Sequence, residues 1–482
     1  MIKIPLYENF KNQLFQSIYN KVRKIKIDNI PKEETYMKKL LIKNGTIIDV
    51  ANEGIFLGAI EIEGNKIKRI IKQDEVLPDS IETIDASGKF IIPGLIDMHC
   101  HINERFAPHF VASGVTTVRN TAGNVNFLSK LIEQPADAPT TPRIYASDRM
   151  IDGSPGQWGP TSFGNFVTDD PEEARKEVRR QVEVGAKFIK LYGWITKDVM
   201  VAAVDEAKKY NLEVAIDLVN SKDVSALDAA EAGVTWFEHA SGFANAMYKG
   251  WNLFVINNEE WSHIDWDNPD QDKVKEICEK MLAYNIKLCP TMMLDDQCVK
   301  YPEFWSPKNM VIESAKNINY MMQYWKAHEE QIDAIRKYNA KPHKLTKAIA
   351  KTYYDMGGTV VAGTDTPALL YTYPGMALHR ELEIFVEIGF TEMEALQAAT
   401  VNAAKSINLN DIGSIQEGKI ADLVILKENP IDNIKHTQEI DLIVKGGKAY
   451  NQEEILSYVP SEEEVNKSQE AFIVEWEAAN VK

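Results

Sequence analysis

Residues 91–103 read IIPGLIDMHCHIN, and the interpretation of the whole chain starts from this stretch. Its apolar run ends in two histidines, His99 and His101. Residues two apart in a strand point to the same face, so the two imidazoles should project together while Cys100 points away. Neighbouring imidazoles at a strand end suit a metal ion. A His-x-His pair alone can equally be a surface or structural feature, so other ligands are needed.

Size and charge limit the possible functions. The chain has 482 residues, 44% of them hydrophobic, which is enough for one large domain and a smaller one. Its formal charge of −17 argues against a nucleic-acid or anionic-membrane partner and is otherwise that of a solvated acidic surface. The expected partner is a small-molecule substrate. The four cysteines form no CxxC pair, which fits a reducing compartment. No signal-peptide pattern and no run of about 18 apolar residues is present, so we expect a cytoplasmic protein.

Short apolar runs alternate with helical stretches from residue 91 onward, as in βαβ units of a parallel sheet. Eight such units predict an α/β protein with a (β/α)8 TIM barrel, whose active site lies at the C-terminal ends of the strands. An open doubly wound sheet is the alternative, but no GxGxxG follows any run. The runs are 95–103, 115–122, 143–150, 187–192, 213–219, 235–240, 286–294 and 359–366.

The regions flanking the barrel have β texture. Residues 38–90 contain short strands with Asn-Gly turns, and similar sequence returns after Gly413. We expect the two regions to pair. The predicted domains are an N-terminal arm (1–36), a composite β-sandwich (37–90 and 410–456), the barrel (91–409) and a helical acidic tail (457–482).

Two connections are too long for plain loops. Residues 241–275 follow the sixth run and residues 295–354 follow the seventh, and both are rich in aromatic residues. They should emerge on the active-site face, as pocket walls or lids. Packing against each other or against a partner subunit is the alternative, so a homo-oligomer is plausible.

The fourth run, KFIKLYG, places Lys190 among apolar residues. Lysine is rarely buried without a partner, and burial lowers its pKa. A neutral amine can react with CO2, and the resulting carbamate is an anionic ligand that can bridge two metal ions. A snorkelling or ion-paired lysine is the alternative.

The sixth and eighth runs also end in polar side chains. The sixth ends in FEHA, with His239, and the eighth in AGTDTP, with Asp365. A satisfied buried histidine and a helix cap are the plain explanations for each alone. Together with His99, His101 and Lys190, they occupy the matching ends of four runs. This joint pattern predicts a metal centre.

At this point the sequence resembles the amidohydrolase superfamily, over residues 38–450. The resemblance depends on a set of motifs, of which the last two are similar to the imidazolonepropionase and metal-dependent prolidase branch. The motifs are PGLIDMHCH, GVTTVRN, FIKLYG, AGVTWFEHAS, LCPTMM, AGTDTP, HRELEIFVEIGFTEMEALQAATVNAA and GSIQEGKIADLVIL.

The resemblance implies a ligand set. His99, His101 and Asp365 would bind a first metal ion, and carboxylated Lys190 would bridge it to a second ion bound by His239. The expected cofactor is one or two divalent ions, zinc first, with manganese or iron as alternatives.

Two positions depart from the family pattern. Asp217, in the stretch VAIDLV, stands where the family has a histidine of the fifth strand. Aspartate can ligate zinc or a harder ion, so the second site is either kept with altered preference or is weak or empty. The loop DGSPGQWG after the third strand replaces a Gly-Gly-His-Gly type sequence, which predicts different substrate contacts.

The predicted reaction is metal-assisted hydrolysis of an amide-like C–N bond. A bound divalent ion lowers the pKa of its water from about 16 towards 7 and so supplies hydroxide, with Asp365 as general acid and base. The expected substrates are an N-acyl amino acid, an Xaa-Pro-type dipeptide or a cyclic amide. Tyr192 and Trp158 are candidate substrate contacts. His379 is a third, with helix capping or packing as its alternative role.

Three other functions stay open. A deaminase of the same superfamily would need the fifth-strand histidine and no fourth-strand lysine, which is the opposite of this chain. A lactonase or phosphotriesterase would use the same metal centre with a different pocket. A non-catalytic metal-binding relative would have kept the fold alone.

Overall fold

The structure is a computed structural model in which residues 39–72, 75–76 and 82–480 are described. The predicted arm, residues 1–36, lies outside the described residues. The described chain contains one mainly antiparallel sheet, built from its two ends, and two parallel sheets formed by the residues between them.

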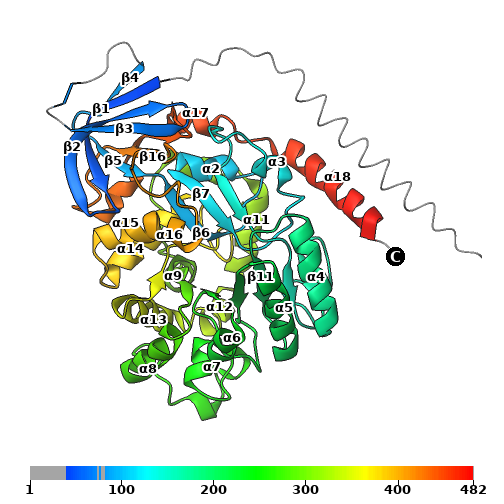
Figure 1. The fold of residues 1–482 in the computed structure, drawn as a ribbon. Helices are drawn as coiled ribbons and strands as arrows, with labels where there is room; N and C mark the ends of the chain where they lie inside the picture. Colours follow the sequence, from blue (N-terminus) through cyan, green and yellow to red (C-terminus); the bar gives the residue numbers. More distant parts are fainter. Residues whose placement is uncertain (1–38, 73–74, 77–81, 481–482) are drawn as a thin grey trace, which may run out of the picture. The chain divides into compact units, whose positions relative to one another are not determined.

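The mainly antiparallel sheet joins strands from before and after the parallel region. Ile91 on β5 lies opposite Ile425 on β16 and opposite Ile47 on β1. Figure 1 shows the blue strands beside the orange β16. The predicted pairing of the two regions is therefore confirmed. The strands are β1 (Lys39–Asp49), β2 (Gly54–Glu63), β3 (Lys66–Lys72), β4 (Glu82–Asp85), β5 (Phe90–Pro93), β16 (Leu423–Leu426), β17 (Ile440–Lys445) and β18 (Lys448–Tyr450).

This sheet also bonds back to the residues just before β16. The Ile67 N–H donates to the Lys419 carbonyl (2.9 Å), and the Ala421 N–H donates to the Asn65 carbonyl (2.9 Å). Its interior is a cluster of buried aliphatic side chains from both regions, including Ile42, Ile60, Leu423 and Ile425. The β-sandwich itself stays a prediction.

The parallel strands follow the predicted apolar runs. One sheet has the order β6-β7-β8 and the other the order β10-β9-β11-β12-β13-β14-β15. The α/β class is confirmed. The strands are β6 (Leu95–Cys100), β7 (Val115–Asn120), β8 (Arg143–Ala146), β9 (Met150–Asp152), β10 (Asn165–Val167), β11 (Ile189–Tyr192), β12 (Val214–Asp217), β13 (Trp236–Glu238), β14 (Lys287–Cys289) and β15 (Thr359–Val360).

Backbone hydrogen bonds link the two parallel sheets at both sides. On one side the Met98 N–H on β6 donates to the Ala362 carbonyl after β15 (3.0 Å). On the other, the Lys187 N–H before β11 donates to the Ala146 carbonyl on β8 (2.8 Å). The third predicted run is split between β8 and β9, and β10 was not predicted. The closed (β/α)8 barrel stays a prediction.

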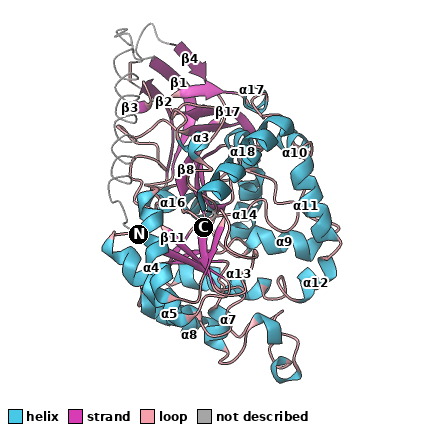
Figure 2. Cartoon of the chain, turned by 90° about the vertical axis from the view of Figure 1, so that its right-hand side faces the viewer, coloured by secondary structure: helices cyan, strands magenta, loops and turns pink. Residues whose placement is uncertain are grey.

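Helices surround the parallel strands (Figure 2). Those between strands or after them are α2 (Ala107–Ala112), α3 (Ser129–Ile132), α4 (Pro171–Glu183), α5 (Lys197–Lys209), α6 (Ala226–Ala232), α14 (Met376–Glu387), α15 (Glu392–Ala398), α16 (Val401–Ser406), η3 (Ile434–Gln438), α17 (Gln452–Leu456) and α18 (Glu462–Asn480). The two long connections contain α7 (Phe243–Met247), η1 (Leu253–Val255), η2 (Glu259–Trp261), α8 (Gln271–Leu282), α9 (Met292–Lys300), α10 (Met310–Ala315), α11 (Asn319–Glu329), α12 (Ile332–Lys337) and α13 (His343–Asp355). Among the described residues, none of these helices is both long and apolar enough to cross a membrane.

Gly363 allows the segment after β15 to approach β6 closely. A Cβ atom built at this position would lie 2.5 Å from the Cys289 Sγ and 2.7 Å from the His99 backbone nitrogen. Neither contact is with the far end of a flexible side chain, so any larger residue must displace the strand that carries His99. The packing of β6 therefore depends on the absence of a side chain at Gly363.

Gly363→Ala should lower the free energy of unfolding by about 1–3 kcal/mol, because overpacking forces backbone shifts. Urea denaturation followed by circular dichroism measures this. Gly54→Ala is the matched control, since its added Cβ would meet only the Asp49 Cβ at an ordinary 3.7 Å. Equal effects of the two changes would contradict the close-packing argument.

Candidate metal centre

His99 and His101 meet Asp365 where β6 ends. The His101 Nε2 lies 2.8 Å from the Asp365 Oδ1, and the His99 Nε2 lies 3.1 Å from the same oxygen. The three side chains offer ligand atoms that all lie within 4.8 Å of one another, so they could hold a metal ion. The predicted convergence of the first and eighth runs is therefore found.

The loop after β15 aims Asp365 at the two histidines. The Thr364 and Asp365 N–H groups both donate to the His99 carbonyl, at 3.0 and 2.7 Å. Asp365 adopts a left-handed backbone conformation with φ 57°. Such a conformation is costly for a residue with a side chain and is retained where the surroundings enforce it. Burial opposes ionisation of Asp365, but the neighbouring His99 and His101 outweigh it and hold its pKa well below the usual range.

Lys190, on β11, is buried as predicted, and its Nζ has no hydrogen-bond partner among the described residues. Burial lowers the pKa of Lys190, although nearby Glu238 and Asp217 partly offset the effect. A lysine held in this way is neither snorkelling nor ion-paired.

Asp217 and His239 lie on the other side of Asp365. The His239 Nε2 is 3.5 Å from the Asp217 Oδ2 and 4.0 Å from the Asp365 Oδ2. The His239 Nδ1 is hydrogen-bonded to the Thr291 hydroxyl, which leaves Nε2 directed at the two carboxylates. Asp217 is opposite Tyr192 in the β11–β12 register, at the same sheet edge as Lys190. The fifth-strand aspartate thus lies with the other predicted ligands.

Sequence reasoning missed Glu238, which lies behind His99. The His99 Nδ1–H donates to the Glu238 Oε2 (2.7 Å), and the Arg119 guanidinium donates to the Glu238 Oε1 (2.9 Å). All three side chains are buried. Burial would raise the pKa of Glu238, but the charges of Arg119, Lys190 and His99 hold it well below the usual range. A carboxylate that fixes one histidine nitrogen leaves the other free for a metal.

The sequence does carry a signal for Glu238. It shares a strand face with Trp236, two residues earlier, and the Arg119 guanidinium lies over the Trp236 ring at 4.2 Å. A carboxylate on a fully buried strand needs a cation. Arg119, in the apolar second run, is a cation of the kind that such a carboxylate requires.

The predicted substrate contacts fall into two groups. Tyr192 and Trp158 line both cavities that open onto the centre. Burial raises the pKa of Tyr192 well above its usual value, so its hydroxyl stays a hydrogen-bond donor. His379 is wrong as a substrate contact. It is 0% exposed and its two ring nitrogens are hydrogen-bonded to the Thr437 hydroxyl (2.9 Å) and the Ser113 carbonyl (3.1 Å). It packs α14 against its neighbours.

Two cavities meet at the centre and share Asp217, His239 and Asp365. The first, of about 290 Å³, is walled by both long connections, through residues such as Trp251, Leu253, Asp295, Tyr324 and His328. The second, of about 450 Å³, lies on the His99 and His101 side and includes residues of β7 and of α18. The long connections therefore serve as pocket walls.

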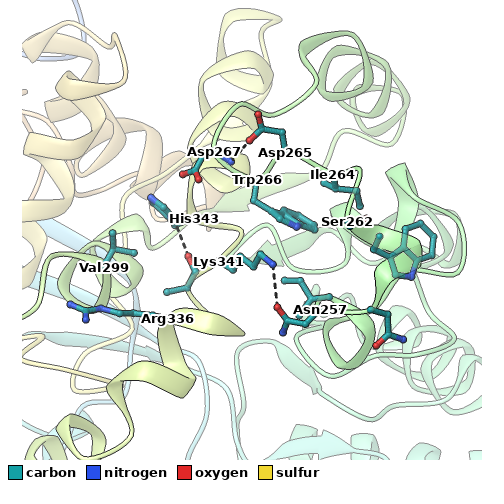
Figure 3. A pocket seen from close by; sticks show the side chains of 14 residues that line it. Asn257, Ser262, Ile264, Asp265, Trp266, Asp267, Val299, Arg336, Lys341 and His343 are labelled. Carbon is teal, nitrogen blue, oxygen red and sulfur yellow. Dashed lines mark hydrogen bonds between the residues drawn. The ribbon is translucent and has the colours of Figure 1, made fainter.

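A third cavity, of about 580 Å³, lies outside this centre (Figure 3). It is formed by the same long connections, and its lining includes none of the predicted site residues. The Lys341 Nζ donates to the Asn257 side chain (3.2 Å), and the His343 Nδ1–H donates to the Ala340 carbonyl (3.0 Å). The Lys341 bond joins the two connections, and the His343 bond lies within the second of them.

Comparison with known proteins identifies the family. The sequence model of the amidohydrolase family matches residues 90–450, which is most of the chain. The chain belongs to the amidohydrolase family. Members of this family are generally metal-dependent, which agrees with the cluster of His99, His101 and Asp365.

Individual relatives are more distant. An ochratoxinase from Aspergillus niger is 25% identical over 327 residues, covering 64% of this chain and 55% of the relative. The chain thus spans about half the length of that relative. A 5'-deoxyadenosine deaminase from Methanococcus maripaludis is 24% identical over 437 residues, covering 86% of this chain and 95% of the relative. A solved Xaa-Pro dipeptidase with bound methionine superposes with a TM-score of 0.62 at 23% identity, over 86% of this chain and all of that chain.

Glu238→Gln should weaken metal binding by about 10- to 100-fold, because an uncharged amide no longer fixes the His99 ring. Zinc titration against a competing chelator measures this. Glu206→Gln is the matched control, since Glu206 is also buried and pairs with Arg179 (3.0 Å), but on the outer helix α5. Unchanged zinc affinity of the Glu238 variant would mean that Glu238 stabilises the fold and has no role in metal binding.

Proposed function

We propose that this chain is a metal-dependent hydrolase that cleaves an amide-like C–N bond of a small molecule. The observation that carries the proposal is the meeting of His99, His101 and Asp365 beside the unpartnered amine of Lys190, at the junction of two cavities. We also propose that the linked parallel sheets form a (β/α)8 barrel, capped by a β-sandwich made from the composite sheet. Both proposals agree with membership of the amidohydrolase family.

The donor set fits one or two divalent ions. His99, His101 and Asp365 would hold the first ion, and His239 with Asp217 would hold the second. Lys190, as a carbamate, would link the two, and its orphaned buried Nζ is the feature that fits this modification. A mixed set of imidazoles and carboxylates suits zinc, with manganese or iron as alternatives. When bound, such an ion lowers the pKa of water and polarises a carbonyl oxygen.

The residues of the chain divide the remaining work. Asp365 is ionised, so one of its oxygens can accept the proton of the attacking water and return it to the leaving nitrogen. The protonated Tyr192 hydroxyl, which lines both cavities, is placed to donate a hydrogen bond to the substrate carbonyl. Trp158 borders both cavities and would contact the substrate there. Water adds across the C–N bond, which gives a carboxylic acid and an amine.

Metal removal and loss of Asp365 should each abolish turnover. Asp365→Asn should lower kcat by about 10²- to 10⁴-fold, as expected for loss of a general acid and base. Chelator-treated protein should regain activity with zinc or manganese. The assay is hydrolysis of a panel of N-acyl amino acids, Xaa-Pro dipeptides, hydantoin-like rings and lactones.

Asp267→Asn is the control, since Asp267 is exposed at the third cavity and pairs with Lys344 (2.9 Å). Full activity of the metal-free protein, or near-normal turnover of the Asp365 variant, would refute the mechanism. Hydrolysis of lactones alone would replace the amide with an ester as the substrate.

Asp217→His should raise the zinc content per chain when zinc is limiting, because imidazole is the usual ligand at this position in the family. Asp217→Ala should lower it, because the second ion loses a ligand. Elemental analysis after gel filtration measures both. If neither variant differs from the unaltered protein in zinc content, Asp217 is not a ligand.

A further inference from the structure

We infer that the cavity on the His101 side binds a free carboxylate of the substrate through Arg105, together with an apolar amino-acid side chain. The inference rests on the proposed function and names its substrate class. The substrate is an N-acylated apolar amino acid or a dipeptide with an apolar C-terminal residue. The amino-acid part lies in this cavity and the acyl part in the other.

Arg105 is close to the metal centre in sequence and in space. It follows His101 by four residues, just before α2, and lines the same cavity as His99, His101 and Asp365. It is only 6% exposed. Burial lowers its pKa, and the charges of Glu462 and Glu104 offset this only in part. The guanidinium nonetheless stays protonated, since arginine has a pKa above about 12.

The hydrogen-bond partners of Arg105 are all neutral. Its guanidinium donates to the side-chain oxygens of Asn103 (3.5 Å), Gln469 (2.5 Å) and Asn466. Its carbon lies 4.7 Å from the centre of the Tyr320 ring. Its Nε has no partner, and no carboxylate of the described residues forms an ion pair with it. A buried guanidinium without a carboxylate is costly, and an anionic ligand would remove that cost.

The nearby acids are occupied elsewhere. The Glu462 carboxylate accepts from the Asn319 side chain (3.0 Å) and the Tyr320 N–H (3.0 Å). Glu104 lies 3.8 Å from the Lys130 Nζ. Neither fills the place of an anion at Arg105. The cavity also lacks any acid among its described lining residues except Asp217 and Asp365, which belong to the metal centre.

Part of this cavity is apolar, lined by Phe106, Phe127, Leu128, Met150 and Phe163, and polar residues such as Asn120, Asn165 and Lys190 line the rest. Phe127 and Phe163 pack against Phe472 of α18, with ring centres 5.2 and 6.1 Å apart. A cation and an apolar wall in one cavity match an apolar amino acid whose carboxylate is free.

The first cavity has the opposite character. No lysine or arginine is among its described lining residues, and Asp295 adds a carboxyl group to Asp217 and Asp365. Away from the metal centre, a substrate carboxylate placed there would meet Asp295 and no lysine or arginine of the described lining. The difference between the cavities therefore fixes the orientation of the substrate at the centre. Hydrolysis then releases the free amino acid beside Arg105 and the acid of the acyl group on the other side.

Matched substrates separate carboxylate recognition from a structural role. The test compares N-acetyl-L-leucine with N-acetyl-L-leucinamide, and the same pairs for methionine and phenylalanine, with zinc-loaded protein. The unaltered protein should prefer the free acids by at least about tenfold in kcat/KM, the order expected for a charged hydrogen bond. Arg105→Gln should raise KM for the acids by at least about tenfold and leave the amides within about twofold, with kcat little changed.

Ser468→Ala is the control for anchoring of α18, because the Ser468 hydroxyl accepts from the Lys130 Nζ and Ser468 neither contacts Arg105 nor lines the cavity. It should change acids and amides alike, by less than about threefold. Equal hydrolysis of acids and amides by the unaltered protein would overturn the inference and leave the proposed function intact. Equal loss on acids and amides in the Arg105 variant would assign Arg105 to anchoring of α18 alone.

Binding of the product tests the inference without turnover. Calorimetric titration should show L-leucine binding at least about tenfold more tightly than L-leucinamide, with Arg105→Gln removing the difference. If no substrate of the panel is hydrolysed but this preference is found, the proposed function fails and the carboxylate site stands. If leucine and leucinamide bind equally, the carboxylate site is refuted.

Discussion

The buried ion pair of Glu238 with Arg119 is the constraint on which the centre depends. Two charges removed from water are costly unless they attract each other at close range. Here the pair links β13 to β7, and the second Glu238 oxygen accepts the His99 proton. The Arg119 Nε and Nη2 have no hydrogen-bond partner among the described residues, and the guanidinium instead lies over the Phe188 and Trp236 rings at 4.2 Å each. The inner layer of the parallel strands is thus held by charge as well as by apolar packing, and the orientation of His99 follows from it.

The strand ends convert this rigid layer into a site. His239, Thr291 and Asp365 all have left-handed backbone conformations, with φ of 60°, 48° and 57°. Each turn directs a side chain back over the end of its strand instead of along it. The left-handed backbone conformation costs free energy at each of these three residues, and the packing of the surrounding sheets compensates for that cost. The strand ends therefore position the side chains of the site, and the packed interiors of the same strands stabilise the fold.

The periodicity of the sequence is sufficient to predict the repeating β/α units. The apolar runs locate the parallel strands, and the ends of parallel strands meet at one edge, so Lys190 and His239 can be placed together from the sequence alone. Asp217 is singled out only by the resemblance to the family. The eighth run is less regular, since β15 covers only Thr359–Val360, yet Asp365 still reaches the centre. Local pattern shows that a buried carboxylate such as Glu238 needs a cation, but it cannot assign the partners of Glu238 or Arg105. Their roles depend on partners far away in the chain, on β7 and α18. The prediction for His379 fails for the same reason, because contacts with Ser113 and Thr437 decide which way its helix faces.

The position of β5 has a consequence for how the protein is made. β5 leads into β6, the strand that carries His99, and it lies between β1 and β16 in the composite sheet. A ribosome synthesises β1 and β5 early but β16 only after the whole parallel region. Until then one edge of β5 is unpaired and apolar, and such edges invite association with other chains. Nascent molecules should therefore depend on chaperones during this interval, and a truncation before β16 should aggregate instead of accumulating as a folded protein.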